Sequence, residues 1–201
     1  MRRLLSIAAL AALVMTACDP SGPGDDDKRE DELTFVRFAA ASPPQVTQAS
    51  FWAVHGQERS LVIRYAGQPA SEPPLLEFRV GALSLLTQPN GVPFLPGDSV
   101  QITVNVDPQG RFLFHFQPSG LVFSPVFPAL LRINPDRADP DLNRDGVVNQ
   151  QDATLEARLR LWKQETVGAP FLPLPTIRIQ ILGIELFEGR VTDFTGFAMA
   201  T

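Results

Sequence analysis

The feature that most limits how this chain can fold is the alternation of apolar and polar residues in its middle part. In the run 100–106 (VQITVNV), every second residue is Val or Ile, and Gln, Thr and Asn lie between them. The run 112–116 (FLFHF) places Phe at every second position. Side chains of a strand point alternately to opposite faces, so a period of two predicts β-strands with one buried face.

Other short apolar runs are typical of further strands, and turn residues separate them. We expect strands at 51–55, 61–65, 75–80, 129–133, 176–181 and 194–200. Turn signals lie between them, among them 89–91 (PNG), 96–98 (PGD), 107–110 (DPQG) and 118–120 (PSG). Many short strands with Pro/Gly-rich connections predict a mainly β fold, an antiparallel β-sandwich formed as one domain by residues 33–201.

A possible calcium loop lies at 141–152 (DLNRDGVVNQQD). Calcium takes six to eight oxygen ligands, which a twelve-residue loop supplies from positions one, three, five, seven, nine and twelve. Those positions are Asp141, Asn143, Asp145, the backbone carbonyl of Val147, Asn149 and Asp152. Gly146 occupies the turn at position six, and Val148 at position eight is expected to contact the core. The alternative is an ordinary surface turn, because Asp, Asn and Gly also dominate turns.

The residues around this loop predict one short helix after it. Gln150–Trp162 has Leu155, Leu159 and Trp162 at helical spacing, whereas Pro135 and Pro140 interrupt any helix before the loop. The loop resembles the calcium loop of dockerin repeats, which also place Asp at the last position. Dockerins carry two such repeats and this chain has one, so we expect a structural Ca²⁺ site within an inserted loop and helix at 141–162.

The first residues are typical of a bacterial lipoprotein signal peptide, which we place at 1–17. Arg2 and Arg3 precede Leu4–Ala17, a mainly apolar run of 14 residues, too short for the roughly 20 that span a bilayer. The run ends in a sequence (MTAC) that resembles a lipobox, which implies lipidation of Cys18, the only cysteine. The alternative is a plain secretory signal followed by an incidental cysteine.

Asp19–Glu32 follows Cys18 and has the composition of a disordered acidic tether. It contains seven acidic and two basic residues, a net charge of −5, and lacks large apolar side chains. Without Arg2 and Arg3 the chain has 15 basic and 22 acidic residues, so the tether carries −5 of a net −7. This acidic balance excludes nucleic acid as the expected partner.

Two segments resemble ZU-type domains, the β-sandwiches named after zonula-occludens and netrin-receptor proteins. They are the run 114–125 (FHFQPSGLVFSP) with the following strand at 129–133, and the closing strand at 191–200 (VTDFTGFAMA). The resemblance implies a β-sandwich, with relatives among bacterial surface lipoproteins. Some members of the family cleave themselves within a His-Phe-Ser triplet; here that triplet is Asp193-Phe194-Thr195, which lacks the histidine.

No motif for catalysis is evident, and we expect no catalytic residues. The two histidines, His55 and His115, are typical of hydrogen-bonded or solvated strand residues. A carboxylate pair for an envelope hydrolase could form only among residues such as Glu58, Glu72 and Glu77. The 14 Phe residues indicate a core, and sugar binding would require an exposed Trp52 or Trp162.

These patterns together predict a lipid-anchored cell-envelope protein, with its body in the periplasm or on the cell surface. Its expected role is non-catalytic, as an interaction or scaffolding module for an envelope protein or glycan. Two alternatives stay open: an envelope hydrolase with a carboxylate pair, and a carbohydrate-binding or dockerin-like adhesion module.

Overall fold

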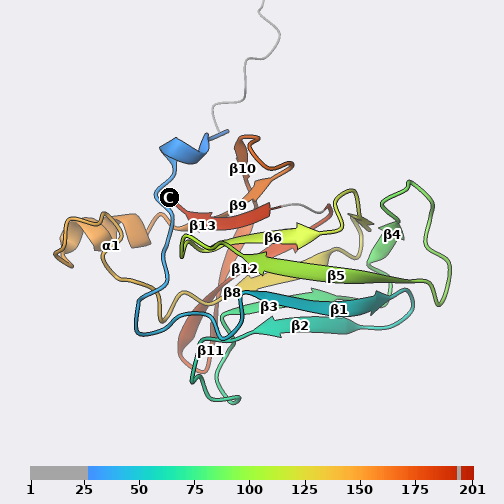
Figure 1. Cartoon of the computed structure of the whole chain (residues 1–201), viewed down its shortest axis with the longest axis horizontal. Helices are drawn as coiled ribbons and strands as arrows, with labels where there is room; N and C mark the ends of the chain where they lie inside the picture. Colours follow the sequence, from blue (N-terminus) through green and yellow to red (C-terminus); the bar gives the residue numbers. More distant parts are fainter. Residues whose placement is uncertain (1–26, 194–195) are drawn as a thin grey trace, which may run out of the picture.

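The computed structural model describes residues 27–193 and 196–201, which form two antiparallel sheets and one short helix (Figure 1). In order across the sheet, the six-stranded sheet contains β1 (Gln48–Val54), β5 (Ser99–Val106), β6 (Leu113–Gln117), β13 (Gly196–Ala200), β9 (Arg160–Gln164) and β10 (Phe171–Pro173). The five-stranded sheet contains β11 (Thr176–Ile181), β12 (Ile184–Val191), β8 (Ala129–Ile133), β3 (Leu76–Val80) and β2 (Arg59–Ile63). A two-stranded sheet pairs β4 (Leu85–Thr87) with β7 (Val122–Phe123). The predicted mainly β architecture is therefore confirmed.

The core lies between the two large sheets and is rich in Phe. Phe116 on β6 contacts Phe78 of the opposite sheet with ring centroids 5.0 Å apart, and it contacts Phe197 on β13 at 5.3 Å. Both contacts are edge-to-face, an arrangement that aromatic rings prefer. The alternation in the sequence produced this core, because Ile102 and Val104 are buried at every second position of β5.

A second, smaller core covers the outer face of the six-stranded sheet. Its members come from the N-terminal segment and from the strands beneath it: Leu33, Phe35, Leu113, Trp162, Phe171, Ala198 and Ala200. Because this sheet is covered on both faces here, every residue of β13 is buried. Trp162 donates its indole N–H to the carbonyl of Ala200 at 3.1 Å.

The helix after the candidate calcium loop is shorter than predicted. Helix α1 spans Gln150–Glu156, and the chain then enters β9, so Trp162 belongs to a strand and not to the helix. Leu161 and Trp162 are both buried, on opposite faces of the sheet, and β9 pairs with β13 along five residues. This pairing and burial on both faces override the weaker helical spacing of Leu155, Leu159 and Trp162.

The last part of the predicted tether lies on the body. Lys28 forms two backbone hydrogen bonds with Phe171, at 2.9 and 2.7 Å, and a 3-10 helix, η1, spans Glu30–Glu32. Arg111 binds Glu30 at 2.5 Å, which explains why this charged segment follows the surface. The signal peptide, Cys18 and residues 19–26 lie outside the described residues, and no helix within the described part is long and apolar enough to cross a membrane.

Candidate metal centre

The loop 141–152 connects β8 to α1 at one end of the sandwich (Figure 1). Residues 134–149 form no helix, so no incoming helix pairs with α1. Leu142 is buried in the main core and fixes the loop to the sandwich. The prediction that Val148 makes this contact is wrong: Val148 is 62% exposed, because the loop turns its second position toward the core instead of its eighth.

The side chains in the first half of the loop turn their oxygens toward the loop's own backbone. The carboxylate of Asp141 accepts the N–H groups of Asp145 and Gly146, at 3.2 and 2.8 Å. Asn143 Oδ1 accepts the same Asp145 N–H at 3.0 Å, and Asp145 Oδ1 accepts that of Val147 at 2.9 Å. Because Asp141 and Asn143 share one donor, the oxygens of positions one and three lie close together.

Asp152 closes the loop from its other end. This residue is buried, and its carboxylate accepts the N–H of Asn149 at 2.8 Å and that of Asn143 at 3.1 Å. The N–H groups of Asn149 and then Asn143 stabilise the charged form, which lowers the pKa of Asp152 below its usual value. The last predicted ligand, Asp152, is therefore next to the second one, Asn143, although they are nine positions apart in the chain.

The predicted ligands Asn149 and Val147 form a hydrogen bond with each other, and Asn149 also bonds to the first turn of the helix. Asn149 Oδ1 accepts the N–H of Gln151 at 2.7 Å and so caps α1, while Asn149 Nδ2 donates to the Val147 carbonyl at 3.0 Å. A carbonyl oxygen has two lone pairs, so that of Val147 can keep this hydrogen bond and still face a cation.

The backbone of the loop contains two residues in the left-handed region. Gly146 has φ 86°, as the turn at position six requires, and Arg144 has φ 62°. A residue with a Cβ is strained in this region, so Arg144 is held there by the surrounding hydrogen bonds.

The residues fit calcium in kind, because Ca²⁺ accepts carboxylate, amide and carbonyl oxygens together. In 27–193 and 196–201, no group of three or more His, Cys, Asp or Glu residues gathers as a metal site. A cation here would therefore depend on the two Asn side chains and the Val147 carbonyl as much as on the carboxylates.

Two residues that sequence reasoning missed belong to the same network. Asp139 lies just before the loop, and its carboxylate accepts the N–H of Asp141 at 3.2 Å. Gln151 Oε1 accepts a hydrogen bond from Asn143 Nδ2 at 3.1 Å. The signal for Asp139 was present, because Asp or Asn occupies every second position from 139 to 145.

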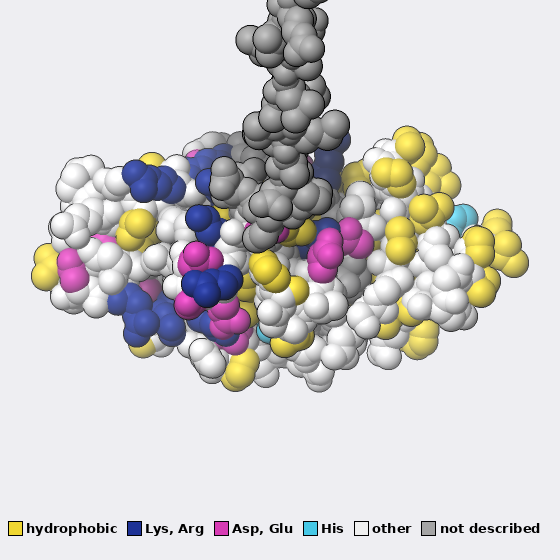
Figure 2. Space-filling model, turned by 90° about the horizontal axis from the view of Figure 1, so that it is seen from above, with side chains coloured by type: hydrophobic (Ala, Val, Ile, Leu, Met, Phe, Trp, Pro, Cys, Tyr) yellow, Lys and Arg dark blue, Asp and Glu magenta, His cyan; other side chains and the backbone are white. Residues whose placement is uncertain are grey.

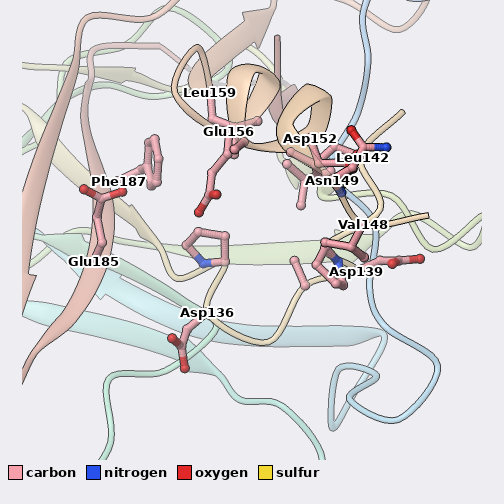
Figure 3. A pocket seen from close by; sticks show the side chains of 15 residues that line it. Asp136, Asp139, Leu142, Val148, Asn149, Asp152, Glu156, Leu159, Glu185 and Phe187 are labelled. Carbon is pink, nitrogen blue, oxygen red and sulfur yellow. Dashed lines mark hydrogen bonds between the residues drawn. The ribbon is translucent and has the colours of Figure 1, made fainter. Parts of the chain in front are cut away.

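A cavity of about 300 Å³ lies beside the loop, under α1. Figure 3 shows Glu156 extending from α1 into this space, with Phe187 and Glu185 of β12 on one side and Asp139 on the other. Leu142, Leu159 and Phe187 contribute apolar walls. Glu185 is paired with Arg178 at 3.2 Å, whereas Asp136, Asp139 and Glu156 also bring carboxylates to the cavity beside the predicted cation ligands.

Each of the carboxylates weighed for hydrolysis lies beside a cation, and Glu72 and Glu77 line one pocket together with Arg132. Glu58 lies 4.0 Å from Arg79, Glu72 is 2.6 Å from Arg137, and Glu77 is 3.3 Å from Arg132. Each acidic group is opposed by a cation, whereas a hydrolytic pair needs two carboxyl groups across an open space.

The histidines and tryptophans lie in four different environments. His55 follows β1, and its Nδ1 is buried without a hydrogen-bond partner in the described part of the chain. His115 is half-buried on β6 beside Gly196. Trp162 is 3% exposed and belongs to the small core, whereas Trp52 is 58% exposed on β1, at the edge of its sheet.

No family model, curated protein or solved structure matches this chain.

Proposed function

We propose that this chain is a cell-envelope lipoprotein, anchored to a bacterial membrane through Cys18, whose β-sandwich is a non-catalytic interaction or scaffolding module. Its body would lie in the periplasm or on the cell surface and bind an envelope protein or glycan, and the resemblance to ZU-type sandwiches supports such a role. Calcium would be a structural ligand of the loop 141–152. The observation that carries the proposal is this loop, in which Asp141, Asn143 and Asp152 approach one another from both ends.

Calcium in this role stabilises the fold and does not switch it, because among residues 27–193 and 196–201 α1 has no partner α-helix that the ion could move. A ligand that binds only the native state adds about 2.7 kcal/mol to the free energy of unfolding at one hundred times its dissociation constant. We expect Asp141→Ala and Asp145→Ala to lower the melting temperature in calcium while the β-sheet circular dichroism signal is unchanged.

The control for this experiment is Asp136→Ala, which removes a carboxylate that lines the neighbouring cavity but lies outside the loop. Chelator should lower the melting temperature of the wild type and of Asp136→Ala, and should barely change that of the two loop variants. Equal melting of the wild type in calcium and in chelator, with no heat in a calcium titration, would reduce the loop to an acidic turn.

The anchor is tested separately, in the native envelope. Cys18→Ser should accumulate as unprocessed precursor, because the thiol that receives the lipid is lost, and membrane extraction should find no lipidated form. The measurements are mass spectrometry of the N-terminus and detergent partitioning. Cleavage and partitioning like those of the wild type would contradict lipidation and favour a plain secretory signal.

One observation keeps carbohydrate binding as a second candidate: Trp52 is exposed on the edge strand β1. A flat exposed ring tolerates both water and a sugar face. Loss of binding to envelope glycans in Trp52→Ala, with unchanged melting temperature, would establish that role; no glycan binding by the wild type would exclude it.

A further inference from the structure

The end of the sandwich that carries β4 lies opposite α1 and includes two segments without charge (Figure 1). Segments 81–97 and 117–129 contain no Asp, Glu, Lys or Arg, in a chain that is 19% charged. The two are joined by the pairing of β4 with β7 and by a hydrogen bond of 2.7 Å from the N–H of Ser124 to the carbonyl of Ser84. We call this end the apolar tip.

The apolar tip exposes large side chains that the core does not use. They are Leu83, Leu86, Val92, Leu95, Val126 and Phe127, with exposed fractions between 45% and 73%. Figure 2 shows hydrophobic side chains gathered at this end of the face in view, where some of them project from the surface. Large apolar patches on a soluble body mark sites that contact a partner or a membrane.

The outward side chains have neighbours in the chain that hold their positions. Leu86 and Leu95 are exposed, whereas the adjacent residues Leu85 and Phe94 are buried in the core, and the Phe94 N–H binds the Leu86 carbonyl at 3.1 Å. Proline fixes backbone φ, which restricts these loops further. Six prolines lie in the two segments: Pro89, Pro93, Pro96, Pro118, Pro125 and Pro128. The tip therefore cannot collapse over its own apolar side chains.

We propose that the apolar tip enters the membrane that holds the lipid anchor, with its side chains in contact with the acyl chains. This inference rests on the proposed anchor at Cys18. Both segments of the tip lack charge, but charged groups lie beside them. The carboxylate of Asp98 accepts the N–H of Leu95 at 2.8 Å, and Glu58, Arg79 and Arg190 line a pocket together with Leu83, Val126 and Phe127. In this orientation the uncharged segments enter the bilayer, while Asp98, Glu58, Arg79 and Arg190 stay among the polar headgroups. Because the segments themselves contain no Lys or Arg, neutral lipids suffice for their insertion.

The length of chain between the anchor and the body permits this orientation. Nine residues lie between Cys18 and Lys28, the first residue that pairs with the body, so the ten steps along the chain span at most ~35 Å when extended. A body of this size is roughly 40 Å across. The anchor therefore keeps the body within about one diameter of the bilayer, close enough for either end to face it.

The test uses the mature, lipidated full chain reconstituted into phosphatidylcholine vesicles. Because Cys18 carries the lipid, one introduced cysteine is the only free thiol and takes an environment-sensitive dye. The dye is placed at the tip in Leu95→Cys and Val126→Cys, and the matched control is Leu182→Cys. Leu182 is 78% exposed at the turn between β11 and β12, away from the tip, so it is at least as accessible as the tip residues.

Dye at the tip should shift to shorter emission wavelengths in vesicles and be quenched by nitroxide-labelled lipids at least roughly threefold more than dye at position 182. Apolar faces of membrane-surface elements lie about 5–10 Å below the headgroup boundary, within reach of such quenchers. A further variant combines Val126→Cys, which carries the dye, with Leu95→Asp and Phe127→Asp. In this variant the quenching should be abolished, while the protein still floats with the vesicles.

The outcomes separate the two proposals. Flotation without tip quenching keeps the anchor and overturns the membrane contact of the tip. Protein that carries no lipid and does not float overturns the proposed anchor. If such unlipidated protein is added to preformed vesicles and dye at the tip is still quenched, the membrane contact of the tip is supported on its own. A concentration-dependent blue shift at positions 95 and 126 without lipid, together with a dimer in light scattering, overturns membrane contact in favour of a second copy of the chain.

Discussion

Individual residues are strained in two of the turns of this sandwich. Leu182 and Gly183 form the two-residue loop between β11 and β12, in which Ile181 pairs with Ile184, and both have positive φ, at 54° and 80°. A loop with two positive φ values suits Asn-Gly, because Asn tolerates this region better than Leu does. Arg144 has a similar φ in the calcium loop, so both sites contain side chains that the local backbone disfavours.

We expect Leu182→Asn to raise the free energy of unfolding by about 1 kcal/mol, the order of the left-handed penalty for a side chain such as Leu. Leu182 is 78% exposed, so little burial is lost with its side chain. Leu182→Ile is the matched control and should destabilise the protein, because β-branched residues are disfavoured at positive φ. Urea unfolding measures all three proteins, and equal midpoints would show that the turn does not limit stability.

At the scale of elements, alternation and short apolar runs each made some of the strands predictable. Strands β5, β6 and β11 follow runs in which alternation is visible, whereas β8 and β13 were expected only as short apolar runs, and β13 is buried on both faces. Strand β12 was missed because the adjacent residues Leu186 and Phe187 are both buried, on opposite faces, which removes the alternation. Strand β9 was predicted as a helix for the same reason, since Leu161 and Trp162 fill two different cores.

The functional candidates also differ in how far the sequence reveals them. The candidate calcium loop could be identified because all its expected ligands lie within twelve consecutive residues, and the structure brings the ends of that loop together at Asp152. Calcium binding itself stays a prediction. The apolar tip could not be predicted, because the β4–β7 pairing joins segments more than 30 residues apart in the chain. Only the absence of charge in both segments was visible beforehand.

Arg111 connects the N-terminal segment to the turn between β5 and β6. Its guanidinium binds both carboxylate oxygens of Asp107, at 3.0 and 3.1 Å, and reaches Glu30 of η1. Burial by itself raises the pKa of Asp107, but the hydrogen bonds and charge of Arg111 outweigh it, and the pKa is lowered. Arg111→Met should lower the free energy of unfolding by about 3 kcal/mol, because it leaves the buried carboxylate of Asp107 with backbone donors only.

The effect of Arg111→Met should depend on pH in one direction. A carboxyl whose pKa is lowered in the folded state contributes stability above its unfolded value, near 3.9, and loses it as the pH falls through the folded value. The difference in free energy of unfolding between wild type and variant should therefore shrink below about pH 4. Urea unfolding between pH 3 and 7 measures it, and a constant difference would show that the loss comes from packing alone.

At the scale of the whole molecule, phenylalanine has two roles that depend on position. Phe116 lies 3% exposed between the sheets, in contact with Phe78 and Phe197, whereas Phe127 is 52% exposed at the apolar tip. The same side chain therefore holds the sandwich together at one position and faces solvent at the other. Truncation of each residue to Ala separates the residues that fold the body from those that are free to contact a partner.

Phe116→Ala should lower the free energy of unfolding by about 3–5 kcal/mol, because it removes buried surface and leaves a cavity between the sheets. Phe127→Ala should change it by less than about 0.5 kcal/mol, because a largely exposed side chain has little packing to lose. Chemical denaturation of the two variants in parallel measures both effects. A large loss for Phe127→Ala would mean that the tip stabilises the fold, and its exposed side chains would then need no membrane to explain them.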